Sequence, residues 1–263
     1  EDINAILSTG NITVHYNTAI GRDITMEQLK EQYNAIYIAI GAQVGKSVNV
    51  DGVNSNGVYS AVEMLGEIGR GNIPDYTGKR VVVVGGGNVA MDAARTALRL
   101  GAEVHIIYRR SEAELPARKE EVHHAKEEGV QFDLLCNPVE ILTDDKDWVT
   151  GIKCIRMELG EPDASGRRRP VEIPGSEFTI DVDTVIMSLG TSPNPLISST
   201  TIGLDVNKRK CIIADEEFGK TSKEGVYAGG DAVTGAATVI LAMGAGKAGA
   251  RGIDEYIKSK YAK

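Results

Sequence analysis

The chain has 263 residues, of which 42% are hydrophobic and 25% are charged, as in ordinary globular proteins. Its 29 basic and 37 acidic residues give a formal net charge of -8, which argues against a nucleic-acid surface as the main function. Because there is no apolar run long enough to cross a bilayer and no charged-then-apolar leader, we expect a cytoplasmic protein that binds neither nucleic acid nor membrane.

The first segment predicts two short helices and a buried strand. Thr25 with Gln28, and Ser60 with Glu63, are each spaced as a capping box at a helix start. Between them, the apolar run 35–40 predicts a parallel strand whose carboxyl end would meet a crevice.

A regular alternation of strands and helices follows. In chain order the predicted segments are strand 81–84, glycine turn 85–87, helix 88–100, strand 104–108, helix 119–128 and strand 131–135. Strands at 151–159, 177–180 and 184–189 then predict an antiparallel meander, with a polar hairpin loop at 163–170. We therefore predict an α/β fold in which a Rossmann-like parallel sheet is covered by a small antiparallel layer.

The cysteines exclude two kinds of redox chemistry. Cys136, Cys154 and Cys211 lie far apart and form no CxxC or other metal-ligand spacing. A dithiol reductase needs a close cysteine pair, and an iron–sulfur protein needs several clustered thiolates. We expect reduced structural thiols and no metal site in this chain.

A dinucleotide-binding motif lies between the first strand and helix of the alternation. It fits GxGxxA and consists of Gly85, Gly86, Gly87, Asn88, Val89 and Ala90. The first glycine permits a tight turn, the next lets the backbone approach a pyrophosphate, and the alanine keeps the helix close to the sheet. The alternative is a glycine turn that serves packing alone.

The end of the next strand distinguishes the two nicotinamide dinucleotides. An NAD site usually places an acid there for the ribose 2′-hydroxyl, whereas this chain has Arg109 and Arg110, with Arg118 on the next turn. Guanidinium groups match a 2′-phosphate, so the pattern favours NADP(H). The alternative is a pair of solvated surface arginines.

Two further glycine-rich stretches have different interpretations. Residues 244–249 also fit GxGxxG, but they follow no strand and lie within a predicted helix, so we assign them to helix packing. Gly229, Gly230 and Asp231 follow an apolar strand, where a carboxylate can accept hydrogen bonds from ribose or ribityl hydroxyls, although the tripeptide alone slightly favours an ordinary Asx turn. Gly190 ends another apolar strand at a point where the chain would pass between two nucleotide domains.

The whole chain resembles the small subunit of NADPH-dependent glutamate synthases. The resemblance is carried by GGGNVAMDAARTALRLGAEV, YRRSEAELPAR, EEVHHAKEEGV, SLGTSPNPL and GVYAGGDAVTGAATVILAMGAGKAG. It implies an NADP domain at 76–190 inserted into a partial FAD-binding domain at 1–75 and 191–263, as in flavoproteins with two dinucleotide sites. It also implies that Asp231 binds the FAD ribityl–pyrophosphate region and that Thr238 and Val239 lie beside the flavin.

In that family NADPH passes a hydride to FAD, and electrons continue to a large subunit that forms glutamate from glutamine and 2-oxoglutarate. Such a transfer needs positioned rings more than an acid or base, so we name no catalytic side chain. The chain resembles only the C-terminal portion of such a subunit, without the cysteine-rich segment and the first FAD motif. We therefore expect it to purify without stoichiometric FAD.

Two other functions fit the same residues. One is a subunit of an NADPH:ferredoxin oxidoreductase, which shares this architecture. The other is a nucleotide-binding module without turnover. Residues 167–169 are three consecutive arginines, which we interpret as a solvated loop or as a docking site for an acidic partner such as ferredoxin.

Overall fold

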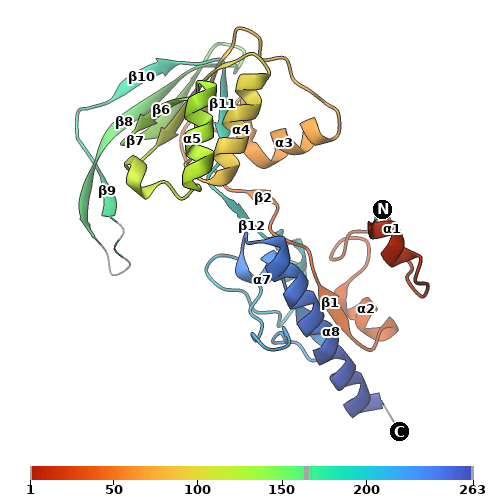
Figure 1. Ribbon diagram of the computed structural model, residues 1–263. Coiled ribbons are helices and arrows are strands. Elements are labelled where there is room, and N and C mark those ends of the chain that lie inside the picture. The colour runs from red at the N-terminus through yellow and green to blue at the C-terminus, as the bar shows by residue number, and fades with distance from the viewer. Residues whose placement is uncertain (1, 163–165, 167, 262–263) are drawn as a thin grey trace. The chain divides into compact units, whose positions relative to one another are not determined.

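The computed structural model describes residues 2–162, 166 and 168–261, and the chain divides into two compact units (Figure 1). Unit 1 contains residues 1–42 and 193–263, and unit 2 contains residues 43–192. Among the described residues, no helix is both long enough and apolar enough to cross a membrane.

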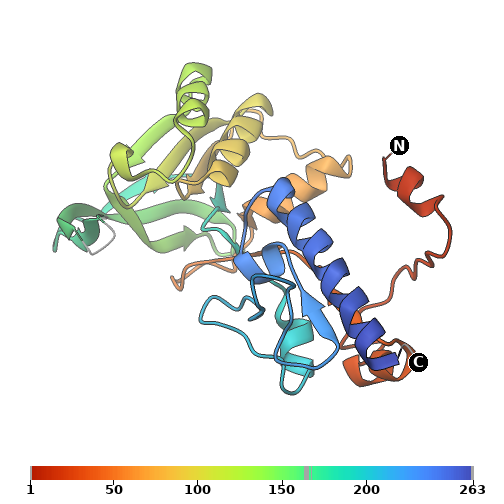
Figure 2. The same cartoon turned by 60° about the horizontal axis from the view of Figure 1, so that its bottom comes forward.

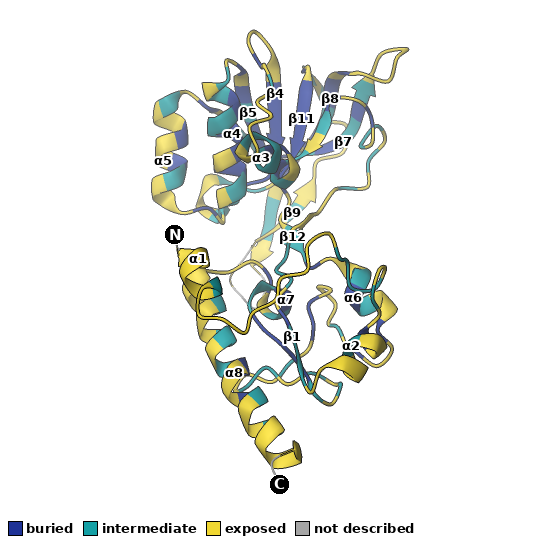
Figure 3. Cartoon of the chain, turned by 90° about the vertical axis from the view of Figure 1, so that its right-hand side faces the viewer, coloured by how far each residue is buried: buried dark blue, intermediate teal, exposed yellow. Residues whose placement is uncertain are grey.

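Unit 2 is built on a five-stranded parallel sheet with the strand order β3-β11-β4-β5-β6. These strands are β3 (Val58–Ser60), β11 (Thr184–Met187), β4 (Arg80–Val84), β5 (Glu103–Tyr108) and β6 (Gln131–Leu134). The predicted Rossmann sheet is therefore confirmed. Its central strands are buried on both faces, as the dark strands in Figure 3 show, which explains why they are continuous apolar runs.

The valines of β4 separate the two hydrophobic cores of unit 2. Val81 and Val83 face a cluster formed with the helices, whereas Val82 and Val84 belong to a second cluster on the opposite face. Successive side chains of a strand point to opposite faces, so one strand contributes to both cores. The helices are α3 (Ala61–Gly69), α4 (Asn88–Arg99) and α5 (Lys119–Glu128), and a 3-10 turn, η1 (Glu112–Glu114), precedes α5.

An antiparallel layer covers the opposite face of the parallel sheet. It contains β7 (Cys136–Thr143), β8 (Val149–Pro162), β10 (Phe178–Asp181) and β9 (Arg168–Glu172), and β8 pairs with each of the other three. The predicted meander is wrong in one strand. β11 lies in the parallel sheet between β3 and β4, because all four of its residues are buried and both of its faces are covered. The predicted loop at 163–170 includes the start of β9, and residues 163–165 and 167 lie outside the described residues.

Unit 1 has a small core around two parallel strands. These are β1 (Ile36–Ile38) and β13 (Val226–Ala228), surrounded by α2 (Met26–Gln32), α6 (Pro195–Thr200), α7 (Asp231–Thr234) and the long α8 (Val239–Tyr261), with α1 (Asp2–Leu7) at the amino end. Figure 2 shows α8, in dark blue, running past β13. The core packs Ile38, Ile197 and Val226 together with Met26 from α2. Segments far apart in the sequence thus complete one unit.

Of the two predicted capping boxes, the first forms and the second does not. The Thr25 hydroxyl accepts a hydrogen bond from the Gln28 amide at 3.1 Å, and the Gln28 Oε1 accepts one from the Thr25 amide at 2.8 Å, which confirms the first box. Ser60 is the N-cap of α3 but makes no side-chain capping bond, so the second box does not form although the helix does. The α3 helix is held instead by burial of Ala61 and Met64 in the core.

The boundaries of the two units differ from the predicted ones. Unit 2 begins at residue 43 rather than 76, because β3 pairs with β11 and α3 packs on the same core as α4. It ends at residue 192 rather than 190. The short strands β2 (Val44–Gly45) and β12 (Thr191–Ser192) pair antiparallel, so the two ends of the inserted unit lie side by side.

Candidate functional site

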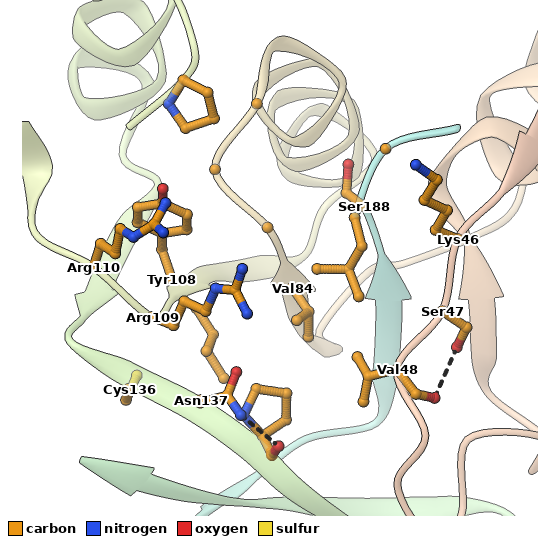
Figure 4. A pocket seen from close by; sticks show the side chains of 18 residues that line it. Lys46, Ser47, Val48, Val84, Tyr108, Arg109, Arg110, Cys136, Asn137 and Ser188 are labelled. Atoms are coloured by element: carbon orange, nitrogen blue, oxygen red, sulfur yellow. Dashed lines mark hydrogen bonds between the residues drawn. The ribbon is translucent and has the colours of Figure 1, made fainter. Parts of the chain in front are cut away.

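A cavity of about 610 Å³ lies where the parallel strands of unit 2 end (Figure 4). Its walls come from residues that follow β4, β5 and β11, together with 46–48 after β2 and 136–138 at the start of β7. The carboxyl ends of parallel strands meet at one edge of a sheet, where nucleotides bind in open α/β folds. All the lining residues belong to unit 2.

The glycines of the predicted motif have three different roles. Gly85 has φ +140°, and a Cβ there would lie 2.1 Å from the carbonyl oxygen of Ser188, so the turn itself requires glycine. A Cβ on Gly86 would lie 2.8 Å from the ring of Tyr108. Gly87 has φ −89°, and a Cβ there would meet nothing within 4 Å. The fold therefore does not require glycine at 87, and the open space there leaves room for a ligand to approach the backbone.

The amino end of α4 faces the cavity without a side-chain cap. Gly87 is the N-cap residue and lines the cavity, so the first N–H groups of the helix have no capping oxygen from a side chain. Exposed N–H groups and the helix dipole together favour an anion such as a pyrophosphate. The remaining motif residues do not line the cavity: Asn88 accepts a bond from the Arg118 amide at 2.9 Å, and Ala90 is fully buried. Val89 packs against the core.

The predicted arginines separate into two groups. Arg109 and Arg110 line the cavity on the side of β5, and both are labelled in Figure 4. Arg118 does not line it, and its guanidinium lies 3.6 Å from the Glu121 carboxylate on α5. Gly190, the predicted strand end, does line the cavity. The structure thus brings Gly190 and the two strand-end arginines to one cavity with the glycine turn.

Two buried polar atoms in this cavity have no hydrogen-bond partner among the described residues. They are the Nε of Arg110 and the hydroxyl of Ser188. Burying such a group without a partner is costly, so each is a candidate contact for a bound ligand. Ser188 and Lys46 lie at the end of the cavity opposite the arginines (Figure 4).

Sequence reasoning missed Lys46 and Ser188. Lys46 follows a two-residue strand far from the glycine motif, and its amide bonds to the carbonyl of Gly190 at 2.9 Å. No local spacing could have indicated this pairing. Ser188 could have been found, because it directly follows an apolar strand that ends at the same edge as β4.

A second cavity, of about 310 Å³, lies in unit 1 and gathers the residues predicted to contact flavin. Gly230, Asp231, Thr238 and Val239 all line it. Asp231 also accepts a bond from the Ala237 amide at 3.2 Å, so its carboxylate closes the loop before α8 as an Asx-type contact would. The Asx-type contact is therefore present, and contact of Asp231 with a flavin stays a prediction.

Tyr37 of β1 also lines the cavity in unit 1. Its hydroxyl is buried without a partner among the described residues, and burial raises the pKa of Tyr37. A Cβ on Gly249 would lie 2.1 Å from the Tyr37 ring, which supports the packing role predicted for 244–249 at this position. Gly244 and Gly246 have open space around them, so packing does not explain these two.

The cysteines are buried and free, as predicted. Burial raises the pKa of Cys136 and of Cys154 to about 12, so neither is a thiolate at neutral pH. Within the described part of the chain there is no cluster of three or more residues able to hold a metal ion.

Residues 5–246 match the model of the family described as pyridine nucleotide-disulphide oxidoreductase. The chain belongs to this family. Among its relatives, the NADP(+)-dependent formate dehydrogenase subunit beta of Moorella thermoacetica is 44% identical over 98% of this chain and 36% of the relative. The glutamate synthase [NADPH] small chain of Halomonas elongata is 38% identical over 90% of this chain and 53% of the relative. The predicted resemblance is thus confirmed.

The fold of this family member also matches solved structures. Mycobacterium tuberculosis FprA in complex with NADPH superposes with a TM-score of 0.74 at 21% identity, over 92% of this chain and 68% of FprA. The agreement supports the α/β architecture with parallel and antiparallel strands. The chain spans about a third to a half of the length of the two curated relatives.

Proposed function

We propose that unit 2 binds NADP(H) and that the chain is the pyridine-nucleotide part of a cytoplasmic, flavin-dependent oxidoreductase. The observation that carries the proposal is one cavity that joins an uncapped helix end, two strand-end arginines and two buried polar atoms without partners. Pyridine nucleotide and FAD are the cofactors of this family. Reduced nicotinamide, when bound, supplies a hydride.

The arrangement of the cavity suggests how the residues would hold the nucleotide. β5 and β11 lie on opposite sides of β4 in the sheet, so Arg109 and Arg110 are separated from Ser188 by the glycine turn. A pyrophosphate at Gly87 would put the 2′-phosphate beside the arginines and the nicotinamide beside Ser188 and Lys46. The protein's contribution is to orient the ring and to exclude water from it.

For unit 1 we propose a part of an FAD site. Asp231, Thr238 and the Tyr37 hydroxyl line one cavity and offer polar groups to the ribityl and phosphate region. Stoichiometric flavin absorbance in the purified chain after gel filtration would show that residues 1–263 suffice for flavin binding. Our expectation is that they do not.

The electron acceptor belongs to a partner subunit, and we propose two candidates. Likeness to glutamate synthase small chains favours a large subunit that forms glutamate from glutamine and 2-oxoglutarate. Higher identity to a formate dehydrogenase beta subunit favours a partner from another redox complex, including one that uses a ferredoxin-type acceptor. Isolating the native complex and identifying its subunits would distinguish them.

The nucleotide assignment is tested by calorimetric titration of wild type and Arg109→Ala with NADPH and NADH. A charge-assisted contact is worth about 1.5–3 kcal/mol, so the variant should bind NADPH roughly ten- to a hundredfold more weakly. NADH lacks the 2′-phosphate, so its affinity should not change. Raising the salt concentration should weaken NADPH binding more than NADH binding. A wild type that prefers NADH, or a variant that weakens both nucleotides equally, would contradict the NADP assignment.

A further inference from the structure

Another cavity of unit 2, which we call the hairpin cavity, adjoins the nucleotide cavity. It has a volume of about 820 Å³ and shares Arg109, Arg110 and Asn137 with the first cavity. Its other wall is formed by Met157 of β8 and by residues 169–172 of β9, with Pro174 after them. Arg109 and Arg110 therefore lie between the glycine turn and the β8–β9 hairpin.

The hairpin is attached to the segment that carries these arginines. Arg168 donates to the Glu114 carboxylate at 3.0 Å, and the Glu114 side chain is only 12% exposed. Glu114 also accepts from Ser111, and the Tyr108 hydroxyl donates to the Glu114 carbonyl at 2.8 Å. The hydroxyl of Ser111, and then Arg168, lower the pKa of Glu114, so this attachment is ionic at neutral pH. It fixes β9 relative to the end of β5.

The hairpin cavity has cationic side chains at one end and apolar side chains along one wall. Arg169 adds a third guanidinium to those of Arg109 and Arg110. Met157 is 6% exposed and lies in the wall with Pro170. Guanidinium groups bind phosphate, and the flat faces of apolar side chains accept a purine ring. Glu172, on the same strand as Arg169, is the acidic residue among those that line the cavity.

We propose that this cavity is the subsite for the adenosine 2′-phosphate end of NADP(H), and that Arg169 of β9 is a specificity-determining residue for the 2′-phosphate. The inference rests on the proposed function, since it extends the same nucleotide beyond the glycine turn. It assigns a binding role to the antiparallel hairpin, which lies outside the Rossmann motif. Glu172 opposes the phosphate and moderates its affinity.

The test is calorimetric titration of the full chain with adenosine 2′,5′-bisphosphate, 5′-AMP, NADPH and NADH. Arg169→Ala should weaken the two 2′-phosphorylated ligands roughly three- to thirtyfold and leave the other two unchanged. Glu172→Gln should strengthen binding of the same two ligands by about two- to fivefold. Arg169→Lys should restore part of the loss because it keeps the charge.

Arg99→Ala is the matched control, because Arg99 is an exposed arginine of unit 2 that pairs with Glu128 and lines neither cavity. It should leave all four affinities unchanged, and circular dichroism should show that every variant folds. Loss of NADPH binding in Arg109→Ala but not in Arg169→Ala would overturn the inference and leave the proposed function standing. Wild type that binds no NADPH would overturn both. An Arg169→Ala chain that binds all nucleotides normally but loses affinity for an acidic electron-transfer protein would assign the hairpin to docking and overturn the inference.

Discussion

Substitution by alanine should affect nucleotide binding at Gly87 and the stability of the fold at Gly85. Gly87→Ala adds a methyl group to open space in the cavity, so the free energy of unfolding should change by less than about 1 kcal/mol. The same methyl group would obstruct a pyrophosphate, and we expect both NADPH and NADH to bind roughly five- to a hundredfold more weakly. Chemical denaturation and calorimetry on the same preparation measure the two effects.

Gly85→Ala provides the comparison. Its added methyl group would meet the Ser188 carbonyl oxygen, and its φ of +140° is unfavourable for alanine. We expect a loss of about 2–4 kcal/mol in the free energy of unfolding. If Gly87→Ala instead destabilises the chain as much as Gly85→Ala while nucleotide binding survives, the glycine turn serves packing alone.

Site residues could be predicted from the sequence where they directly follow a recognisable strand. Gly85 to Gly87 and the two arginines after β5 follow strands of a recognisable alternation, so their position at the cavity follows from the topology. Arg118 has the right charge and spacing, but it directly precedes α5, and its exposed side chain lies near Glu121 and does not line the cavity. Lys46 reaches the cavity through the pairing of β2 with β12, more than a hundred residues away, and no local pattern encodes such a pairing, whereas Ser188 directly follows an apolar strand and could have been found.

At the scale of elements, one arginine joins the two helices that cover the sheet. Arg95 of α4 donates to Glu121 and Glu128 of α5 at 2.9 and 2.7 Å, and its side chain is 20% exposed. Hydrogen bonds from Arg95, and then from Arg99, lower the pKa of Glu128 from its ordinary value of 4.5 to about 2. The folded state therefore holds this carboxylate ionised over a wider pH range than the unfolded chain does.

The pH dependence of stability follows from the direction of that shift. A carboxyl group with a lowered folded-state pKa stabilises the fold above its unfolded pKa, and the contribution disappears as the pH falls from about 4.5 towards 2. Arg95→Leu should lower the melting temperature by a few degrees at pH 7, and the difference from wild type should shrink below pH 4.5. Thermal unfolding followed by circular dichroism at pH 7, 5, 4 and 3 measures it.

Arg99→Leu is the control for this pair of helices, because Arg99 also contacts Glu128 but its side chain is 64% exposed. Its effect on melting temperature should be smaller at every pH, since exposed ion pairs are screened by solvent. A difference between wild type and Arg95→Leu that stays constant from pH 7 to pH 3 would mean that Arg95 stabilises the helices through packing of its stem instead.

Helices and strands could be predicted from the sequence where a local pattern is specific to one structure. The four valines of β4 gave its correct carboxyl end and a start one residue late, and the left-handed Gly129 gave the correct end of α5, because a buried strand and an αL cap each have a distinct signal. β11 was assigned to the meander because a short apolar run does not state which sheet it joins. β7 contains Pro138 and is only partly buried, so its pattern was too weak to be recognised.

At the scale of the whole molecule, the chain inserts one unit into another, and pairing at the junction makes this possible. β2 and β12 bring the two ends of unit 2 together, while β1 and β13 join the two segments of unit 1. The insertion was predicted, but its amino-terminal boundary was not. Residues 43–75 contain no nucleotide-binding motif, and the pairing of β3 with β11 and the packing of α3 against the core of α4 assign them to unit 2.

Unit 2 should therefore fold and bind NADPH without unit 1. Both of its hydrophobic clusters and all the residues lining the nucleotide cavity come from within 43–192. A segment of about 150 residues can bury enough surface for independent stability, and its ends are held together by the β2–β12 pair. We expect the fragment 43–192 to unfold cooperatively and to bind NADPH within about threefold of the affinity of the full chain. A fragment that folds but binds NADPH far more weakly would show that unit 1 contributes to the nucleotide site, because the walls of the cavity are the same in both. A fragment that does not fold would show that the two units are stable only together.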